Sequence, residues 1–184
     1  MVQNWDSTTA EILILLLRGE NHLRNIAREL KMSHSTVQRK LVNLVKEQIL
    51  ESKTEGKNKV FKIKKGMIAK TSIYVVEQYK VMKLFQQYPE LSIITEDIIK
   101  KTSQDIVILF GSYAKGIAKK ESDIDIYIET TSKKMKKEVE NVHSKIKVKI
   151  GEFDTSSLLI KEIVKNHVIL KGVEEFYAKT KFFE

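Results

Sequence analysis

The stretch Phe110–Ile128 reads FGSYAKGIAKKESDIDIYI and contains the strongest chemical pattern of the chain. An apolar run ends at Gly111 and Ser112, which predicts a buried strand followed by a turn. After a spacer of ten residues, aspartates alternate with isoleucines. Because successive side chains of a strand point to opposite faces, we expect Asp123 and Asp125 on one face, about 7 Å apart, with the isoleucines in the core.

This turn and this pair of carboxylates suit a phosphate ligand. The segment SYAKGIA (112–118) is expected to begin a helix, so Gly111 and Ser112 would offer backbone N–H groups and a hydroxyl at a helix N-terminus. Two carboxylates on one strand face can chelate a divalent cation together with phosphates. An isolated pair of this kind is more often the soluble face of an edge strand, so the preceding turn is what favours a ligand site.

The combination GSYAKG…SDIDIYI resembles the GSxxxG…SDxD signature of the DNA polymerase β superfamily of nucleotidyltransferases. It is most similar to the minimal nucleotidyltransferases of bacteria and archaea, which are often encoded with helical toxin partners. The resemblance covers residues 90–184 and implies a nucleoside triphosphate (NTP) ligand. It implies that Asp123 and Asp125 are catalytic and hold Mg²⁺ ions that align the α-phosphorus with an attacking hydroxyl. The residues to which it assigns nucleotide binding are Gly111, Ser112 and Ser122.

The neighbouring segment KIKVKI (145–150) differs from the family, whose active members usually place a third carboxylate on this strand. Its alternation puts the apolar residues in the core and Lys145, Lys147 and Lys149 on the face of the aspartates. Glu152 and Asp154 have the parity of the apolar face and would need a bulge at Gly151 to reach the site. Lysines there would pair with the aspartates and compete with metal, or form a solvated strand face. Catalysis therefore stays open.

The N-terminal segment shows helical spacing of apolar residues, then a hairpin pattern. We expect helices at 7–18, capped by Ser or Thr, at 22–30, and at 34–50, capped by Ser33, then strands on both sides of a turn at 55–58. This order resembles the winged helix-turn-helix transcription regulators of bacteria and archaea over residues 5–65. The residues expected to face double-stranded DNA are His34, Ser35, Thr36, Gln38, Arg39, Lys53, Lys57 and Lys59.

The distribution of charge agrees with a DNA partner. The net charge is +9, and residues 1–65 hold 13 Lys and Arg against 7 Asp and Glu, a surplus of +6. Such a surplus favours anionic partners, and lysines of the hairpin would neutralise phosphates. A winged helix used only for protein contacts or dimerisation is the alternative.

The remaining segments complete the expected architecture. A long helix over 66–87 ends before Pro89 and either forms a homodimer or packs on the next domain. Further helices are expected at 90–102, 131–144 and 156–170, the last leading into a short extended piece, and 173–183 closes the chain. The four histidines do not cluster, so a histidine metal site has little support.

Composition indicates the cellular compartment of the protein. With no Cys there is no disulfide framework, and the longest apolar run, Ile12–Leu17, is too short to cross a membrane. The N-terminus lacks the pattern of a secretion signal, so we expect a cytoplasmic protein without a membrane partner.

The sequence thus predicts an α+β protein with a winged helix-turn-helix at 1–65, a connecting helix at 66–89, and a nucleotidyltransferase-like mixed sheet flanked by helices at 90–184. One hypothesis is a DNA-binding protein that binds NTP–Mg²⁺ and transfers NMP to a hydroxyl, for instance on a partner protein from a neighbouring gene. The other is an inactive, antitoxin-like regulator whose second domain senses nucleotide or binds a partner.

Overall fold

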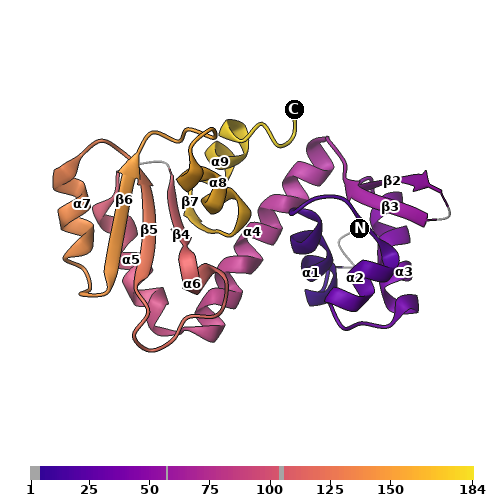
Figure 1. Cartoon of the computed structure of the whole chain (residues 1–184), viewed down its shortest axis with the longest axis horizontal. Helices are drawn as coiled ribbons and strands as arrows, with labels where there is room; N and C mark the ends of the chain where they lie inside the picture. The colour runs from indigo at the N-terminus through magenta and orange to yellow at the C-terminus, as the bar shows by residue number, and fades with distance from the viewer. Residues whose placement is uncertain (1–4, 57, 104–105) are drawn as a thin grey trace. The chain divides into compact units, whose positions relative to one another are not determined.

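The computed structural model describes residues 5–56, 58–103 and 106–184. The chain divides into two compact units, one formed by Met1–Val76 with Phe183–Glu184 and the other by Glu77–Phe182 (Figure 1). The division falls inside the long helix α4 (Met67–Gln87), within the segment expected to connect the domains. No helix of the described residues is long and apolar enough to cross a membrane.

The N-terminal unit has the element order of a winged helix-turn-helix. The order is α1 (Ser7–Leu16), β1 (Asn21–His22), α2 (Leu23–Glu29), α3 (His34–Lys46), β2 (Leu50–Glu55) and β3 (Asn58–Ile63). The strands form an antiparallel sheet in the order β1-β3-β2, and the β2–β3 hairpin is the wing. The predicted fold of this segment is confirmed.

Local signals explain most of these boundaries. Ser33 caps α3 as expected, because its Oγ accepts a hydrogen bond from the Thr36 N–H. The cap of α1 is Asp6 instead of a Ser or Thr, and its carboxylate accepts from the Thr9 N–H at 2.9 Å. Helix α3 ends at Lys46, earlier than predicted, and Gln48 just beyond it has a φ of 62°.

The C-terminal unit is built around a mixed sheet. Its elements after α4 are α5 (Glu90–Lys101), β4 (Val107–Phe110), α6 (Gly111–Ala114), β5 (Ile124–Glu129), α7 (Lys133–Glu140), β6 (Ile146–Gly151), α8 (Leu158–Lys165), β7 (Val168–Lys171) and α9 (Val173–Lys179). The strand order is β6-β5-β4-β7. Strands β5 and β6 are parallel, whereas β4 is antiparallel to both its neighbours. The predicted mixed sheet flanked by helices is confirmed.

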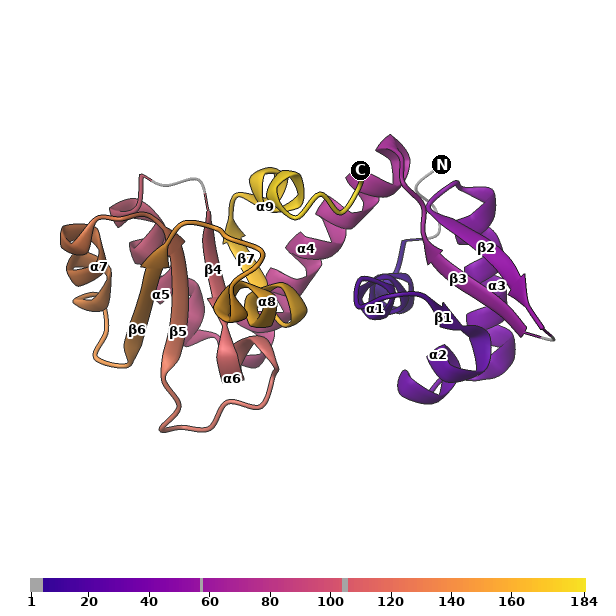
Figure 2. The same cartoon turned by 45° about the horizontal axis from the view of Figure 1, so that its top comes forward.

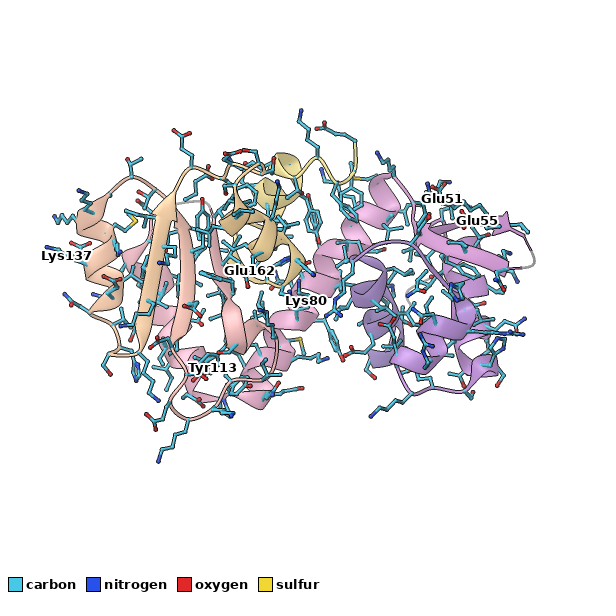
Figure 3. All side chains as sticks on the ribbon, viewed as in Figure 1. Glu51, Glu55, Lys80, Tyr113, Lys137 and Glu162 are labelled. Atoms are coloured by element: carbon cyan, nitrogen blue, oxygen red, sulfur yellow. The ribbon has the colours of Figure 1, made fainter. Side chains whose placement is uncertain are left out.

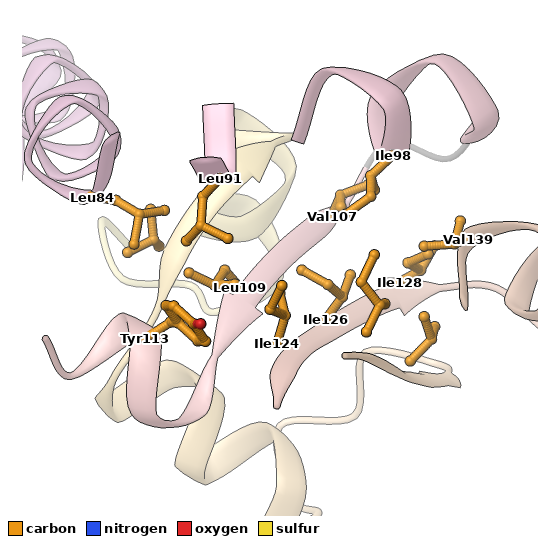
Figure 4. Close-up of a cluster of buried hydrophobic side chains, with 13 residues drawn as sticks. Leu84, Leu91, Ile98, Val107, Leu109, Tyr113, Ile124, Ile126, Ile128 and Val139 are labelled. Atoms are coloured by element: carbon orange, nitrogen blue, oxygen red, sulfur yellow. The ribbon is translucent and has the colours of Figure 1, made fainter. Parts of the chain in front are cut away.

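Each face of this sheet packs against helices. Alternate residues of β5, Ile124, Ile126 and Ile128, join a buried cluster with Leu91 of α5 and Val139 of α7 (Figure 4). Helices α8 and α9 cover part of the other face (Figure 2). On this face an aromatic series runs from Tyr127 of β5 through Phe153 to Phe176 of α9. Asp125 alternates with these isoleucines along β5, so it belongs to this second face.

Two elements of this unit are shorter than the sequence suggested. Helix α6 has only the four residues Gly111–Ala114, and Gly116 just after it has a φ of 69°, which does not continue a right-handed helix. Helix α8 ends at Lys165, and the apolar residues that follow form strand β7. The first difference matters for the site, because a single helical turn has little macrodipole to attract phosphate.

Candidate functional site

The turn after β4 and the carboxylate of Asp125 lie against each other. Phe110 pairs with Asp125 across the antiparallel β4–β5 ladder, and Gly111 follows with a φ of 72°. A Cβ atom on Gly111 would overlap Asp125 Oδ2 and lie 3.1 Å from Asp125 Cγ. Glycine is therefore required twice at this position, for its backbone conformation and for the space that the carboxylate occupies.

The neighbouring strand presents lysines to the same face. In the parallel β5–β6 register, Asp125 pairs with Lys147 and Tyr127 pairs with Lys149. Both lysines are exposed, and Val148 between them is buried in the core. The predicted common face of Asp125, Lys147 and Lys149 is confirmed by this register.

Asp154, one of the two acidic residues that the sequence offered for a third ligand, is engaged in a local turn. The carboxylate of Asp154 accepts hydrogen bonds from the Ser156 N–H at 2.8 Å and from the Ser156 hydroxyl at 2.7 Å. Hydrogen bonds from Ser156 also hold the pKa of Asp154 below its ordinary value. Within 5–56, 58–103 and 106–184, no three acidic or histidine side chains gather closely enough to hold a metal ion.

The two aspartates have different surroundings. Asp123 precedes β5 and is exposed, whereas Asp125 lies within β5 and is partly buried. Burial raises the pKa of Asp125 above its ordinary value of 3.8, and the nearby carboxylate of Asp123 raises it further. The charge of Lys149 acts in the opposite direction. The two carboxylates repel each other, and a cation bound between them would reduce this repulsion.

The two serines of the motif occupy different environments. Ser112 lies in α6 and is partly buried, and its carbonyl accepts from the Ile117 N–H at 3.1 Å. Ser122 closes the loop before β5, because its Oγ accepts from the Lys119 N–H at 2.8 Å. Ser122 therefore shapes the loop that leads to Asp123, and its assignment to nucleotide binding stays a prediction.

A further ion pair, which the sequence did not indicate, lies at this site. Lys115, the residue directly after α6, places its Nζ 3.2 Å from Oε1 of Glu162. Figure 3 labels Glu162 on α8. The two residues are 47 positions apart in the chain, so no local pattern could reveal the contact. Both charges act on Asp125, which places the pair beside the DxD motif.

The same unit contains a buried polar network around Glu77 of α4. The Glu77 carboxylate is completely buried and accepts from the Tyr177 hydroxyl at 2.7 Å and from Lys80 Nζ at 2.7 Å. His167 Nε2 lies 3.4 Å from it. Burial alone would raise the pKa of Glu77, but His167 and Lys80 outweigh burial and hold this pKa at about 2. The network ties α4 to the C-terminal segments of its own unit.

In the N-terminal unit, the residues expected to face DNA lie mainly at the start of α3 and on the wing. Exposed members with a described position are His34, Ser35, Gln38, Arg39, Lys53 and Lys59. Thr36 is partly buried, and its hydroxyl lies 2.8 Å from that of Ser33 in the helix cap. Lys53 forms ion pairs with Glu20 and Glu55, so part of the charge of the wing is neutralised internally. Lys57 lies outside the described residues.

Comparisons with known proteins were made for the whole chain. Two solved regulator structures show some similarity, with TM-scores of 0.35 and 0.36. The first is the adhesin competence repressor AdcR from Streptococcus pyogenes, with 23% sequence identity over 51% of this chain and 77% of that one. The second is a ZitR variant from Lactococcus lactis, with 21% identity over 50% of this chain and 69% of that one. No curated protein matches the sequence.

The C-terminal unit has a more specific match. Residues 92–179 match the family model described as polymerase beta, nucleotidyltransferase. This range contains the Gly-Ser turn, both aspartates, the lysines of β6 and Glu162. Residues 92–179 are therefore a nucleotidyltransferase domain of the polymerase β family.

Proposed function

We propose that this protein is a DNA-binding regulator whose nucleotidyltransferase domain binds a nucleoside triphosphate with Mg²⁺. The single observation that supports the nucleotide site most is the close approach of Asp125 to Gly111. A turn without a side chain leaves its backbone N–H groups accessible beside a carboxylate, which suits a phosphate bridged to a metal ion.

The residues present fit one nucleotide-bound Mg²⁺ ion. Mg²⁺ prefers oxygen ligands and is commonly held by one or two carboxylates together with substrate phosphates and water. Asp123 and Asp125 would be the protein ligands, and their mutual repulsion favours a cation between them. Lys147 and Lys149 are exposed on the same face, where their charge would attract phosphate oxygens. The bound ion would supply charge neutralisation at the phosphates.

Turnover is a separate question from binding. Lys147 stands in register with Asp125, and a fixed positive charge there opposes a second cation at the aspartates. This observation favours a domain that senses nucleotide without transferring it. The alternative is transfer of NMP to a hydroxyl, with release of pyrophosphate, and the acceptor would be a side chain of this protein or of a partner encoded by a neighbouring gene. The Gly-Ser turn and both aspartates support that alternative.

Nucleotide binding is tested by calorimetric titration with a β,γ-imido ATP analogue and Mg²⁺. We expect binding by the unmodified protein and a loss of at least about tenfold in Asp125→Asn, which removes a ligand charge. Asp97→Asn is the matched control, because Asp97 is an exposed carboxylate of α5. Labelled ATP then separates the two alternatives, since transfer would label the protein or its partner. The proposal fails if neither the protein nor its metal complex binds the analogue.

The proposed DNA contacts follow from α3 and the wing. The exposed start of α3 carries polar side chains and Arg39, as expected of a recognition helix that reads the major groove. Lys59 is exposed on β3 of the wing, where it would contact the phosphate backbone. A DNA partner would also place the protein in the cytoplasm of a bacterial or archaeal cell.

DNA binding is tested by fluorescence anisotropy with the DNA upstream of its own gene over a range of salt concentrations. We expect a salt-sensitive complex that Arg39→Ala weakens, by about 1–3 kcal/mol if Arg39 contacts a base. Lys46→Ala is the matched control, because Lys46 has the same charge and lies at the opposite end of α3. If no salt-sensitive complex forms, the regulator proposal is wrong.

A homodimer is the arrangement that we propose for DNA binding, because a dimer matches a palindromic operator. Helix α4 exposes Ile68, Val75 and Met82 at intervals of seven residues, with 56%, 51% and 58% of their surface accessible. Such spacing is typical of a helix that packs along a second helix. Light scattering of the protein and of Val75→Lys would show a dimer and its loss. A monomer at all concentrations would contradict this arrangement.

A further inference from the structure

The ion pair between Lys115 and Glu162 stands out because of its position at the proposed nucleotide site. Lys115 is the C-cap of α6, so its backbone N–H donates to the carbonyl of Gly111 at 3.2 Å. Its side chain reaches Glu162 on α8, a helix that covers part of the sheet face carrying Asp125. The ammonium group thus stands beside the turn on which the phosphates would lie.

The exposure of both side chains keeps this contact exchangeable. Lys115 is 37% exposed and Glu162 is 57% exposed. Ion pairs exposed to this extent contribute little to stability, because water solvates both charges. A phosphate carries more negative charge than a carboxylate and offers several acceptor oxygens, so it competes well for an ammonium group. A triphosphate on the Gly111 turn would therefore take Lys115 from Glu162.

Separation of this ion pair adds a cost to phosphate binding. Before binding, Lys115 Nζ lies 3.2 Å from Glu162 Oε1, where the two opposite charges attract each other. If a phosphate withdrew Lys115, Glu162 would lose this attraction and be solvated by water instead. The cost of binding would then include this separation of charges.

Building on the proposed nucleotide site, we propose that Lys115 binds the phosphates of the nucleotide and that Glu162 competes with them for Lys115. Glu162 thereby sets the nucleotide concentration at which the domain is occupied. The pair is not itself a metal site, and neither residue takes part in a chemical step. Glu162 is a competitor within the protein itself, and it lowers the affinity of the site for any ligand with a triphosphate group.

The test is a double-mutant cycle measured by calorimetric titration of the β,γ-imido ATP analogue at constant Mg²⁺ and low salt. We expect Glu162→Gln to tighten binding by about threefold to tenfold and Lys115→Met to weaken it by about tenfold. In the Lys115→Met background, Glu162→Gln should change affinity by less than about twofold, because the ammonium group for which Glu162 competes is absent. Tripolyphosphate should show the same pattern, whereas binding of adenosine should be insensitive to both changes.

Glu96→Gln is the matched control, because it breaks an exposed ion pair with Lys100 on α5, which packs on the opposite face of the sheet. It should leave affinity unchanged. If Glu162→Gln tightens binding equally with and without Lys115, simple repulsion explains it and the competition is overturned. If Glu162→Gln weakens binding, Glu162 is a ligand and the proposal is wrong. Failure of every variant to bind the analogue would instead reject the nucleotide site itself.

Discussion

Gly111→Ala is the sharpest test of the site, because the substitution adds one methyl group directly against the Asp125 carboxylate. The backbone of Gly111 has a φ of 72°, where alanine costs about 1–2 kcal/mol. The new Cβ would overlap Asp125 Oδ2 and lie 3.3 Å from Asp125 Cβ, so the carboxylate must leave its rotamer, at about 0.5–1.5 kcal/mol. We therefore expect a loss of about 1.5–3.5 kcal/mol in the free energy of unfolding, as the sum of these terms.

Gly116→Ala separates the two causes. Gly116 has a φ of 69°, so it carries a similar backbone cost, but its Cβ would meet only Gln87, 3.3 Å from the end of a flexible side chain. Urea unfolding followed by circular dichroism should show a loss of about 1–2 kcal/mol in this variant. The difference between the variants measures the overlap with Asp125.

The same substitution should also affect ligand binding. Because Asp125 is displaced in Gly111→Ala, we expect affinity for the imido analogue with Mg²⁺ to fall by about 10- to 100-fold, while Gly116→Ala retains it. In the Asp125→Ala background, Gly111→Ala should cost only its backbone term. Wild-type affinity in a folded Gly111→Ala variant would refute the idea that Gly111 is needed to make room for the carboxylate.

Three other predictions concern charge. Glu77→Gln removes the buried carboxylate that pairs with the partly buried Lys80, and it should cost about 3–5 kcal/mol in the free energy of unfolding measured in urea. Because the folded-state pKa of Glu77 is lowered to about 2 from 4.5, the wild type should also lose stability as pH falls through this range, and the variant should lack this component. Burial raises the pKa of Asp125, so affinity for Mg²⁺ with the analogue should begin to decline at a higher pH than that at which an ordinary aspartate of pKa 3.8 protonates. The Asp125→Asn variant should lack this decline, and an unchanged pH profile in that variant would contradict the prediction. Lys59→Ala should reduce the salt dependence of DNA binding by about one phosphate contact in anisotropy titrations, and an unaltered slope would exclude Lys59 from the interface.

The local pattern of the sequence was sufficient for the elements that carry the site. Alternation in DIDIYI and KIKVKI predicted both strands and the faces of their side chains, because the period of a strand is independent of its partners. The apolar run before Gly111 predicted β4 in the same way. The winged helix followed from helical spacing, the Ser33 cap and a hairpin turn, which are all short-range signals.

Several predictions of helix length were incomplete because signals for different secondary structures lie close together in the chain. The helix expected from Ser112 stops after one turn, since Gly116 adopts a positive φ. The apolar residues after Lys165 continue the helical spacing, yet they form β7 because strand β4 offers them a hydrogen-bonding partner. Propensity and spacing describe a segment by itself, so they cannot weigh such a partner.

The sequence by itself determined the family of the C-terminal domain, the common face of the aspartates and the lysines, and the winged-helix order, since each depends on neighbours within a few residues. Only the tertiary structure decided how closely Gly111 approaches Asp125, and that Glu162 meets Lys115 and Glu77 meets His167 and Tyr177. These contacts join residues that the packing of α4, α8 and α9 on the sheet brings together. Such proximity depends on the arrangement of whole elements in space, which local periodicity does not encode.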